Sequence, residues 1–205
     1  MIKRLFDFIA SLMGIFLLSP FLMLISVWIK LDSEGPIFFR QVRVGLNGMS
    51  FKIHKFRTMK ESSENQGRLT IGNDDRITQS GQFLRKFKFD ELPQLIDVFI
   101  GKMSLVGPRP EVQEFIDIYP VDVKNKILSI KPGITDMASI EMANENDILG
   151  KYKNPKQAYI DIILPIKQKH YLNYVDNHSM WIDIKIIFLT LKRIIVRQPD
   201  DSKNS

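Results

Sequence analysis

The sequence of 205 residues contains no cysteine. This absence excludes a disulfide framework, a thiolate nucleophile and a zinc site built on cysteine, and it suits a reducing compartment. The chain also lacks the phosphate loop G-x-x-x-x-G-K-[ST], the dinucleotide motif G-x-G-x-x-G, the nucleophile elbow G-x-S-x-G and the zincin motif H-E-x-x-H. The three histidines, His54, His170 and His178, show no metal-ligand spacing, so we expect each at the surface or satisfied within the fold.

The composition is that of a chain that folds around a core. Hydrophobic residues make up 44% of the sequence and charged residues 25%, and we find no internal repeat. The length allows one compact domain with an appendage. The formal net charge of +6 indicates an anionic partner, but charge alone does not distinguish nucleic acid, phospholipid and a phosphorylated substrate.

A long apolar segment lies near the N-terminus. The run from Phe8 to Ile29 carries no charge, and as a helix of about 33 Å it could cross a hydrocarbon core of roughly 30 Å. A cleaved signal peptide is the weaker interpretation, because the run is longer than the usual apolar region and no small-x-small cleavage site follows it. The sequence therefore predicts a membrane segment.

On the residues alone, this segment is either a spanning helix or a re-entrant one. Pro20 lacks the N–H group that would bond the carbonyl of Phe16, so the helix must bend or break at Ser19-Pro20, where the Ser19 hydroxyl can satisfy a freed carbonyl. Each half would be roughly 16 Å long, enough to enter the bilayer and leave by the same face. Basic residues on both flanks favour the re-entrant form. They are Lys3, Arg4, Lys30, Arg40 and Arg43.

Beyond the membrane segment, the pattern is that of a small mixed domain. Residues 37–44 and 51–56 are rich in aromatic and β-branched side chains, and the turn sequence 45–48 between them predicts a β-hairpin. The polar stretch 60–76 is expected to be a surface loop or a lid. The expected helices are 80–89 and 90–100, residues 111–130 are expected to be helix and turn, and an irregular, proline-stiffened loop is expected at 104–110.

Residues 181–195 show an amphipathic helical pattern with a basic face. Trp181, Ile184, Phe188 and Leu191 recur at three- and four-residue steps, whereas charged residues such as Asp183 take the other side. The apolar face either packs into the core or lies in the membrane interface, with the cations on anionic headgroups. Both interpretations remain open at this point.

Asp90 and Glu91 form an acidic pair at the expected start of a helix. The pair has a purely structural interpretation, because ordinary helices use an aspartate cap followed by a glutamate. Its neighbourhood favours a site: the prolines flanking Arg109 would fix a guanidinium able to grip a phosphate. Carboxylates among cations are suited to binding Mg²⁺ on a diphosphate or to attacking phosphorus. The other nearby cations are Lys55, Arg57, Arg85, Lys86 and Lys88.

Five stretches together carry a family resemblance. They are residues 55–59 (KFRTM), 73–78 (NDDRIT), 90–95 (DELPQL), 103–110 (MSLVGPRP) and 131–135 (KPGIT). In this order they resemble the bacterial sugar transferase family, the monotopic polyprenyl-phosphate phosphoglycosyl transferases. The resemblance runs from about Lys3 to Arg197, and the pairing of DELPQL with SLVGPRP is highly specific.

The resemblance implies an activity and roles for individual residues. Such enzymes move a phospho-sugar from a UDP-sugar to undecaprenyl phosphate with Mg²⁺, at the cytoplasmic face of the bacterial inner membrane, beginning lipid-linked glycan assembly. Asp90 matches the family's nucleophile and Glu91 its partner, and this pair would also bind the metal. Arg109 matches the phosphate-gripping arginine, and Lys55 matches the basic strand end. Arg57 shares that strand end, and Arg85 is a further phosphate-binding candidate from its position before the pair.

The resemblance also implies a re-entrant helix and completes the predicted architecture. The fold class is α+β and mostly helical, with a re-entrant helix-break-helix at 1–31, a small β-hairpin and amphipathic interfacial helices around a catalytic domain at 32–197. A disordered tail is expected at 198–205. The chain resembles the minimal catalytic form of the family. It departs from the usual pattern at Lys88-Phe89. It also departs after Thr135, where Asp136 begins a different continuation, and this second change concerns the sugar specificity and leaves the chemistry intact.

Two other classes of function compete with the transferase. A membrane-anchored binder of anionic polymer needs only the basic charge and the amphipathic helix. A scaffold that recruits glycan-assembly enzymes keeps the fold but needs no intact Asp90-Glu91 pair. The expected partners of the transferase are the UDP-sugar, undecaprenyl phosphate, membrane phospholipid, downstream glycosyltransferases and a second copy in a homodimer, without nucleic acid.

Overall fold

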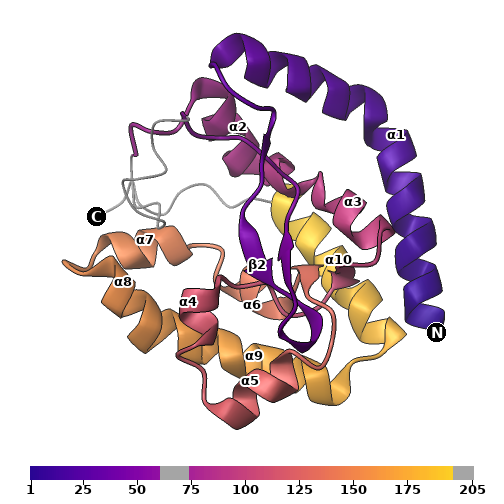
Figure 1. The fold of residues 1–205 in the computed structure, drawn as a ribbon, viewed down its shortest axis with the longest axis vertical. Coiled ribbons are helices and arrows are strands. Elements are labelled where there is room, and N and C mark those ends of the chain that lie inside the picture. Colours follow the sequence, from indigo (N-terminus) through magenta and orange to yellow (C-terminus); the bar gives the residue numbers. More distant parts are fainter. Residues whose placement is uncertain (61–73, 196–205) are drawn as a thin grey trace.

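The computed structural model describes residues 1–60 and 74–195. The loop expected over 60–76 therefore lies largely outside the described residues, as does the tail expected over 198–205. The described chain is mostly helical and forms small two-stranded sheets, which confirms the α+β class. Figure 1 shows a long N-terminal helix, α1 (Ile2–Asp32), running along the outside of the rest of the chain.

Helix α1 carries the predicted membrane segment. Within the described ranges it is the one helix long and apolar enough to cross a membrane, by length and composition. It continues through Pro20, and Figure 1 shows it bent. Ser19 Oγ donates to the Phe16 carbonyl at 2.8 Å, the group that Pro20 leaves without its amide partner. The expected helix-break-helix is thus a bend in one continuous helix, because the serine hydroxyl replaces the missing bond.

The first turns of α1 are tied to the body of the protein. Lys3 Nζ lies 2.6 Å from Asp183 Oδ2. The Arg4 guanidinium donates to the carbonyls of Val98 and Phe99 at 2.6 and 2.8 Å. Both contacts join residues almost a hundred or more positions apart in the chain, so they fix the N-terminal end of α1 against the fold.

The C-terminal end of α1 is held in the same way. Asp32 Oδ2 accepts hydrogen bonds from the Ser80 amide at 2.9 Å and the Ser80 hydroxyl at 2.7 Å. The Arg57 guanidinium donates to the carbonyl of Ser33 at 2.8 Å and also to that of Glu34. Most of the apolar residues between the two ends are exposed, among them Leu12, Met13, Phe16, Leu17, Met23, Leu24 and Val27.

The predicted hairpin is confirmed. Strands β2 (Val42–Val44) and β3 (Ser50–Lys52) pair antiparallel, and the short turn η1 (Leu46–Gly48) joins them. A second antiparallel pair, β1 (Phe38–Phe39) with β4 (Lys55–Phe56), continues the ribbon toward α1. The ribbon therefore carries Lys55 at its far end.

One sheet was not expected from the sequence. Strand β5 (Ser104–Val106) pairs parallel with β6 (Gly133–Thr135), although we predicted an irregular loop from residue 104. The two segments approach closely after the strand: a Cβ added to Gly107 would lie 2.6 Å from the carbonyl oxygen of Lys131. This approach explains why glycine stands at that position.

The helices pack around this framework. The expected helices 80–89 and 90–100 appear as α2 (Gln79–Phe87), η3 (Phe89–Glu91) and α3 (Gln94–Phe99), and 111–130 as α4 (Gln113–Ile116) and α5 (Val121–Ile127). The remaining helices are α6 (Met137–Glu141), α7 (Glu145–Gly150), α8 (Pro155–Ala158), η4 (Tyr159–Ile163), α9 (Leu164–Asn177) and α10 (Met180–Ile195). The largest buried cluster joins α4, α5, α9 and η4, so these helices form the main core.

Helix α10 buries a different face from the expected one. Asp183, assigned to the polar side, is buried and paired with Lys3, and Ile186 packs in a small core cluster. Trp181, Phe188 and Leu191 are exposed, Trp181 by 82%. The core-packing interpretation is therefore wrong for these exposed residues, whereas Ile187 of the same stripe packs against the cluster around Ile186.

Candidate active site

The acidic pair lies in a tight turn between two helices. Lys88 follows the last residue of helix α2 and adopts the left-handed conformation with φ of 59°, and the turn η3 then carries Asp90 and Glu91 into α3. Such a φ is uncommon for a residue with a side chain and reverses the chain sharply. Neither η3 nor α3 has a side-chain cap, so the interpretation of Asp90 as an ordinary helix cap is wrong.

Two cations from distant segments meet this pair. Lys55 Nζ, at the end of the ribbon, lies 2.8 Å from Asp90 Oδ2 and 3.4 Å from Glu91 Oε1. Arg109 bonds to Glu91 through both terminal nitrogens: Nη1 donates to Oε2 at 3.1 Å, and Nη2 donates to Oε1. Both carboxylates are buried. The structure thus brings Asp90, Glu91, Lys55 and Arg109 together.

The charges of the site are strongly coupled. Burial by itself would raise the pKa of Glu91, but the charges of Arg109 and Lys55 outweigh burial and hold that pKa well below its usual range. The charge of Glu91 in turn raises the pKa of Arg109. Glu91 is therefore an anion at physiological pH, and each of its two oxygens accepts a hydrogen bond from Arg109.

Asp90 differs from Glu91 in having one oxygen unoccupied. Its Oδ2 faces Lys55, but its Oδ1 is buried and has no hydrogen-bond partner in the described part of the chain. Buried polar atoms in native structures are nearly always satisfied, and an orphan of this kind needs an explanation. A ligand oriented toward Oδ1, whether an electrophile or a metal ion, would supply it.

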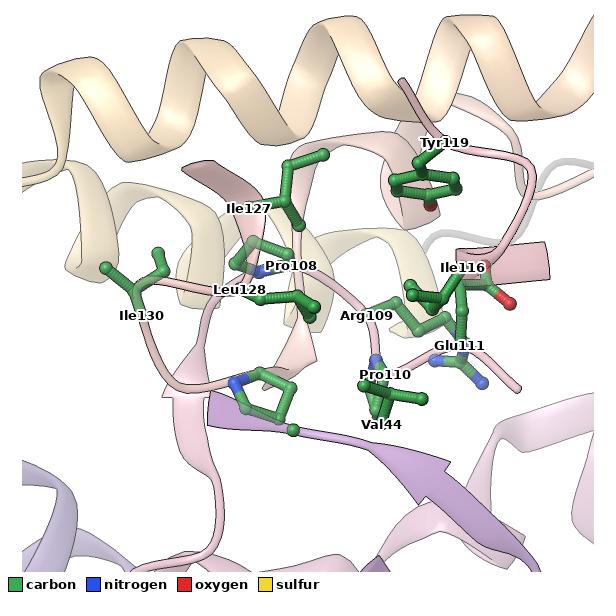
Figure 2. Close-up of a pocket in the computed structure, with 12 residues that line it drawn as sticks. Val44, Pro108, Arg109, Pro110, Glu111, Ile116, Tyr119, Ile127, Leu128 and Ile130 are labelled. Atoms are coloured by element: carbon green, nitrogen blue, oxygen red, sulfur yellow. The ribbon is translucent and has the colours of Figure 1, made fainter. Parts of the chain in front are cut away.

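The loop that carries Arg109 is held from behind. Figure 2 shows Pro108 lying among Ile127, Leu128 and Ile130. The cavity left between the loop and this apolar wall is about 10 Å³, no more than the space for one water molecule. Because the wall is packed and proline restricts the backbone on each side, the base of the Arg109 side chain has a fixed position.

A buried polar network lies next to this loop, and we did not predict it. The carboxylate of Glu111 accepts from Tyr159 Oη at 2.7 Å, and Lys167 Nζ donates to the same hydroxyl at 3.1 Å. Arg43 Nη1 donates to the carbonyl of Pro110 at 3.1 Å. The position of Glu111 directly after the Pro-Arg-Pro sequence was the available signal. Its partners come from elements far away in the sequence.

Two other predicted phosphate-binding residues have different surroundings. Arg57 is buried at the C-terminal end of α1, where its guanidinium donates to backbone carbonyls, so it is not among the side chains that contact the acidic pair. Arg85 Nε donates to Thr58 Oγ1 at 2.8 Å. Burial lowers the pKa of Arg85, and the negative charge of Asp90 opposes that shift. Arg85 therefore lies within the electrostatic field of the site.

His54 has a structural role next to the site. Its ring Nδ1 lies 2.8 Å from Asp97 Oδ1, and its backbone N–H donates to Asp97 Oδ2 at 2.7 Å. Arg40 Nη1 lies 2.6 Å from the other ring nitrogen. These contacts confirm the expectation of a satisfied histidine, and they fix the residue that precedes Lys55.

The donor set suits a loosely held Mg²⁺ ion. No group of three or more histidine, cysteine or acidic side chains able to hold a metal occurs in the described ranges. Mg²⁺ keeps several waters and commonly binds through one or two carboxylates together with substrate phosphates. The unpartnered Oδ1 of Asp90 fits such a site, whereas a closed cage made of protein ligands alone does not.

Fold and site together define a membrane-associated domain whose buried acidic pair is clamped by cations. The family model for bacterial sugar transferases matches residues 1–197, so the chain belongs to that family. A UDP-glucose:undecaprenyl-phosphate glucose-1-phosphate transferase of Klebsiella pneumoniae is 39% identical over 92% of this chain and 39% of its own length. An undecaprenyl-phosphate N-acetylgalactosaminephosphotransferase of Aeromonas hydrophila is 36% identical over 95% of this chain and 44% of its own length. An uncharacterized sugar transferase of Bacillus subtilis, EpsL, is 34% identical over 96% of this chain and 89% of its own length. The chain thus spans less than half of the first two relatives.

Proposed function

We propose that this chain is a phosphoglycosyl transferase that moves a phospho-sugar from a UDP-sugar to undecaprenyl phosphate and releases UMP. The observation that carries the proposal is the buried, unpartnered Oδ1 of Asp90 within a cluster of cations. The Klebsiella and Aeromonas relatives are named for the same class of donor, a UDP-sugar, and for the same acceptor, undecaprenyl phosphate. A non-enzymatic binder of anionic polymer has no use for two buried carboxylates at its cationic site.

The chemistry follows from the positions of the side chains. Oδ1 of Asp90 attacks the sugar-bearing phosphorus of the UDP-sugar, and the bond between that phosphorus and the bridging oxygen breaks, so UMP leaves. A phosphate oxygen of undecaprenyl phosphate then attacks the same phosphorus and restores the Asp90 carboxylate. Lys55 and Arg109 offset the charge of the phosphates in both steps, which is the main task of a protein in phosphoryl transfer.

Asp90 and Glu91 are the residues that would hold Mg²⁺. When bound, this ion supplies neutralisation of phosphate charge. In this proposal the side chains of the protein orient the two carboxylates. Lys55 orients Asp90 through Oδ2, and Arg109 keeps Glu91 ionised and oriented.

We further propose that α1 is re-entrant and that the protein is monotopic at the cytoplasmic face of the bacterial inner membrane. Lys3 and Arg4 tie one end of α1 to the domain, and Asp32 ties the other, so both ends lie on the same side of the bilayer. The exposed bend at Ser19-Pro20 is then the deepest point. The exposed stripe of α10 fits a helix in the membrane interface.

The place in metabolism is part of the same proposal. Transfer to undecaprenyl phosphate is the first membrane step of glycan assembly for an O-antigen, capsule, exopolysaccharide or glycoprotein. Delivery of the product to downstream glycosyltransferases and assembly as a homodimer remain predictions.

The test is a half-reaction in the absence of acceptor. Purified protein is incubated with Mg²⁺ and a panel of UDP-sugars, and UMP release and intact mass are measured. We expect about one UMP per active enzyme from the correct donor and a mass increase of one phospho-sugar, because a carboxylate nucleophile splits the reaction in two. Asp90→Asn should abolish both signals, whereas Asp147→Asn, at an acidic residue remote from the pair, is the matched control. An adduct on another side chain, or a mutant that still reacts, would assign the nucleophile elsewhere.

A further inference from the structure

A second cationic pocket lies at the N-terminal end of α1, away from the acidic pair. It is a cavity of about 300 Å³. The residues that line it include Lys3, Arg4, Asp7, Ser104, Lys131 and Tyr174. Helix α3 separates this pocket from the site already described: Glu91 precedes its first turn, whereas Arg4 bonds to carbonyls of its last turn.

The cations of this pocket are crowded and incompletely neutralised. A Cβ added to Gly101, whose φ is +84°, would lie 3.1 Å from Arg4 Nη2 and 3.6 Å from Lys131 Nζ, so both cations meet over the same glycine. Arg4 bonds to neutral carbonyls. Within the described residues, Lys131 has no carboxylate at ion-pair distance. Burial and then the charge of Arg4 lower the pKa of Lys131, while the charge of Asp7 opposes this shift.

The two acidic residues near the pocket already have hydrogen-bond or ion-pair partners. Asp7 is buried and accepts from the Ser104 hydroxyl at 2.8 Å and the Leu105 amide at 3.1 Å. Asp183 pairs with Lys3 and also accepts from Tyr174. Three cations, Lys3, Arg4 and Lys131, therefore face two carboxylates, and one positive charge remains in excess.

The pocket lies where the two membrane-facing helices begin. Lys3 and Arg4 are in the first turn of α1, just before its apolar run, and Asp183 belongs to the first turn of α10. Trp181, two residues earlier, is 82% exposed, and tryptophan is enriched at the depth of lipid headgroups. Given the proposed membrane association, this is the depth at which phospholipid phosphates lie.

We propose that this pocket binds the phosphate of an anionic membrane phospholipid, with Lys131 and Arg4 as its cationic ligands. Lys131 contacts the phosphate directly, and Arg4 couples the bound headgroup to the end of α3. Because α3 begins next to Glu91, the lipid fixes the helix from which the acidic pair extends.

The experiment is a binding titration of the whole chain in nonionic detergent. Dihexanoylphosphatidylglycerol is added, and the rise of the midpoint of thermal unfolding gives an apparent dissociation constant. We expect Lys131→Ala to weaken binding about tenfold, because one hydrogen bond to a charged phosphate is lost. Lys131→Arg should restore it. Lys153→Ala removes the same charge from an exposed position and should bind as the unmodified chain does.

Two results of this titration would overturn the proposal. Equal affinity of Lys131→Ala and the unmodified chain would place the lipid elsewhere and overturn the site. If inorganic phosphate stabilises the protein as strongly as the lipid at equal concentration, the pocket binds a free anion and the lipid assignment is wrong. The titration uses no sugar nucleotide, so failure of the proposed transferase activity would appear only in the separate assay of UMP release.

Discussion

Replacing Arg109 by lysine tests whether the guanidinium geometry, and not its charge alone, is needed at the site. Arg109 reaches both oxygens of Glu91, with one contact at 3.1 Å, whereas a lysine ammonium can bond well to only one of them. A hydrogen bond to a charged group contributes about 1.5–3 kcal/mol. Because 30% of the Arg109 side chain is exposed, solvent screens part of this energy, and we take the lower value.

We therefore expect Arg109→Lys to reduce kcat/KM about tenfold, since 1.36 kcal/mol corresponds to a factor of ten in rate. The assay is the initial rate of UMP release from the preferred UDP-sugar, with thermal unfolding measured in parallel. Lys153→Ala, which also alters an exposed cation, is the control and should react at the unmodified rate. A change of less than twofold at equal stability would refute the reasoning, because Arg109 would then contribute only its charge.

Three other predictions concern acid stability, metal dependence and topology. The pKa of Glu91 is lowered in the folded state. The ionised carboxylate therefore stabilises the fold above the usual glutamate pKa near 4.3, and this stabilisation is lost as the pH falls further. In chemical denaturation, Glu91→Gln should therefore show a smaller decline of the unfolding free energy below about pH 4. Chelation with EDTA should stop UMP release without lowering the unfolding midpoint, and added Mg²⁺ should restore it; metal-independent turnover would contradict the donor assignment. Ile2→Cys and Lys153→Cys should each be labelled only from the cytoplasmic side, whereas Ser19→Leu with Pro20→Ala should move residue 2 of part of the population to the other side.

The sequence was most informative where one local signal is enough. The hairpin follows from aromatic strands around Gly45-Leu46-Asn47-Gly48, and the bend in α1 follows from Pro20, because both depend on nearby backbone geometry. The acidic pair could likewise be selected from its neighbours in the chain. The meeting of Lys55 with Asp90 could only be inferred by family resemblance, since these residues come from separate elements.

The errors have a common physical cause. We predicted Asp183 on the solvent-exposed face because carboxylates of an amphipathic helix usually lie there. It is buried instead, and its ion pair with Lys3 and the hydrogen bond from Tyr174 offset the cost of burying its charge. The parallel pairing of β5 with β6 also depends on a distant partner and leaves almost no alternation to detect in three residues. A pattern that uses only neighbouring residues cannot predict such contacts between distant parts of the chain.

Arg57 shows how helix α1 and the segment that contacts the acidic pair are joined. Its guanidinium binds carbonyls at the C-terminal end of α1, while Lys55, two residues earlier, holds Asp90. The backbone between them also belongs to the ribbon, where Phe56 pairs with Phe38 and is almost fully buried. A shift of the end of α1 would therefore move Lys55 relative to Asp90, because three consecutive residues cannot absorb the displacement without breaking one of these contacts. In the proposed reaction the acceptor is a lipid, so Asp90 must keep a constant height above the bilayer. In that proposal this short segment supplies the constraint, because it links the end of α1 to the Asp90 carboxylate through Lys55.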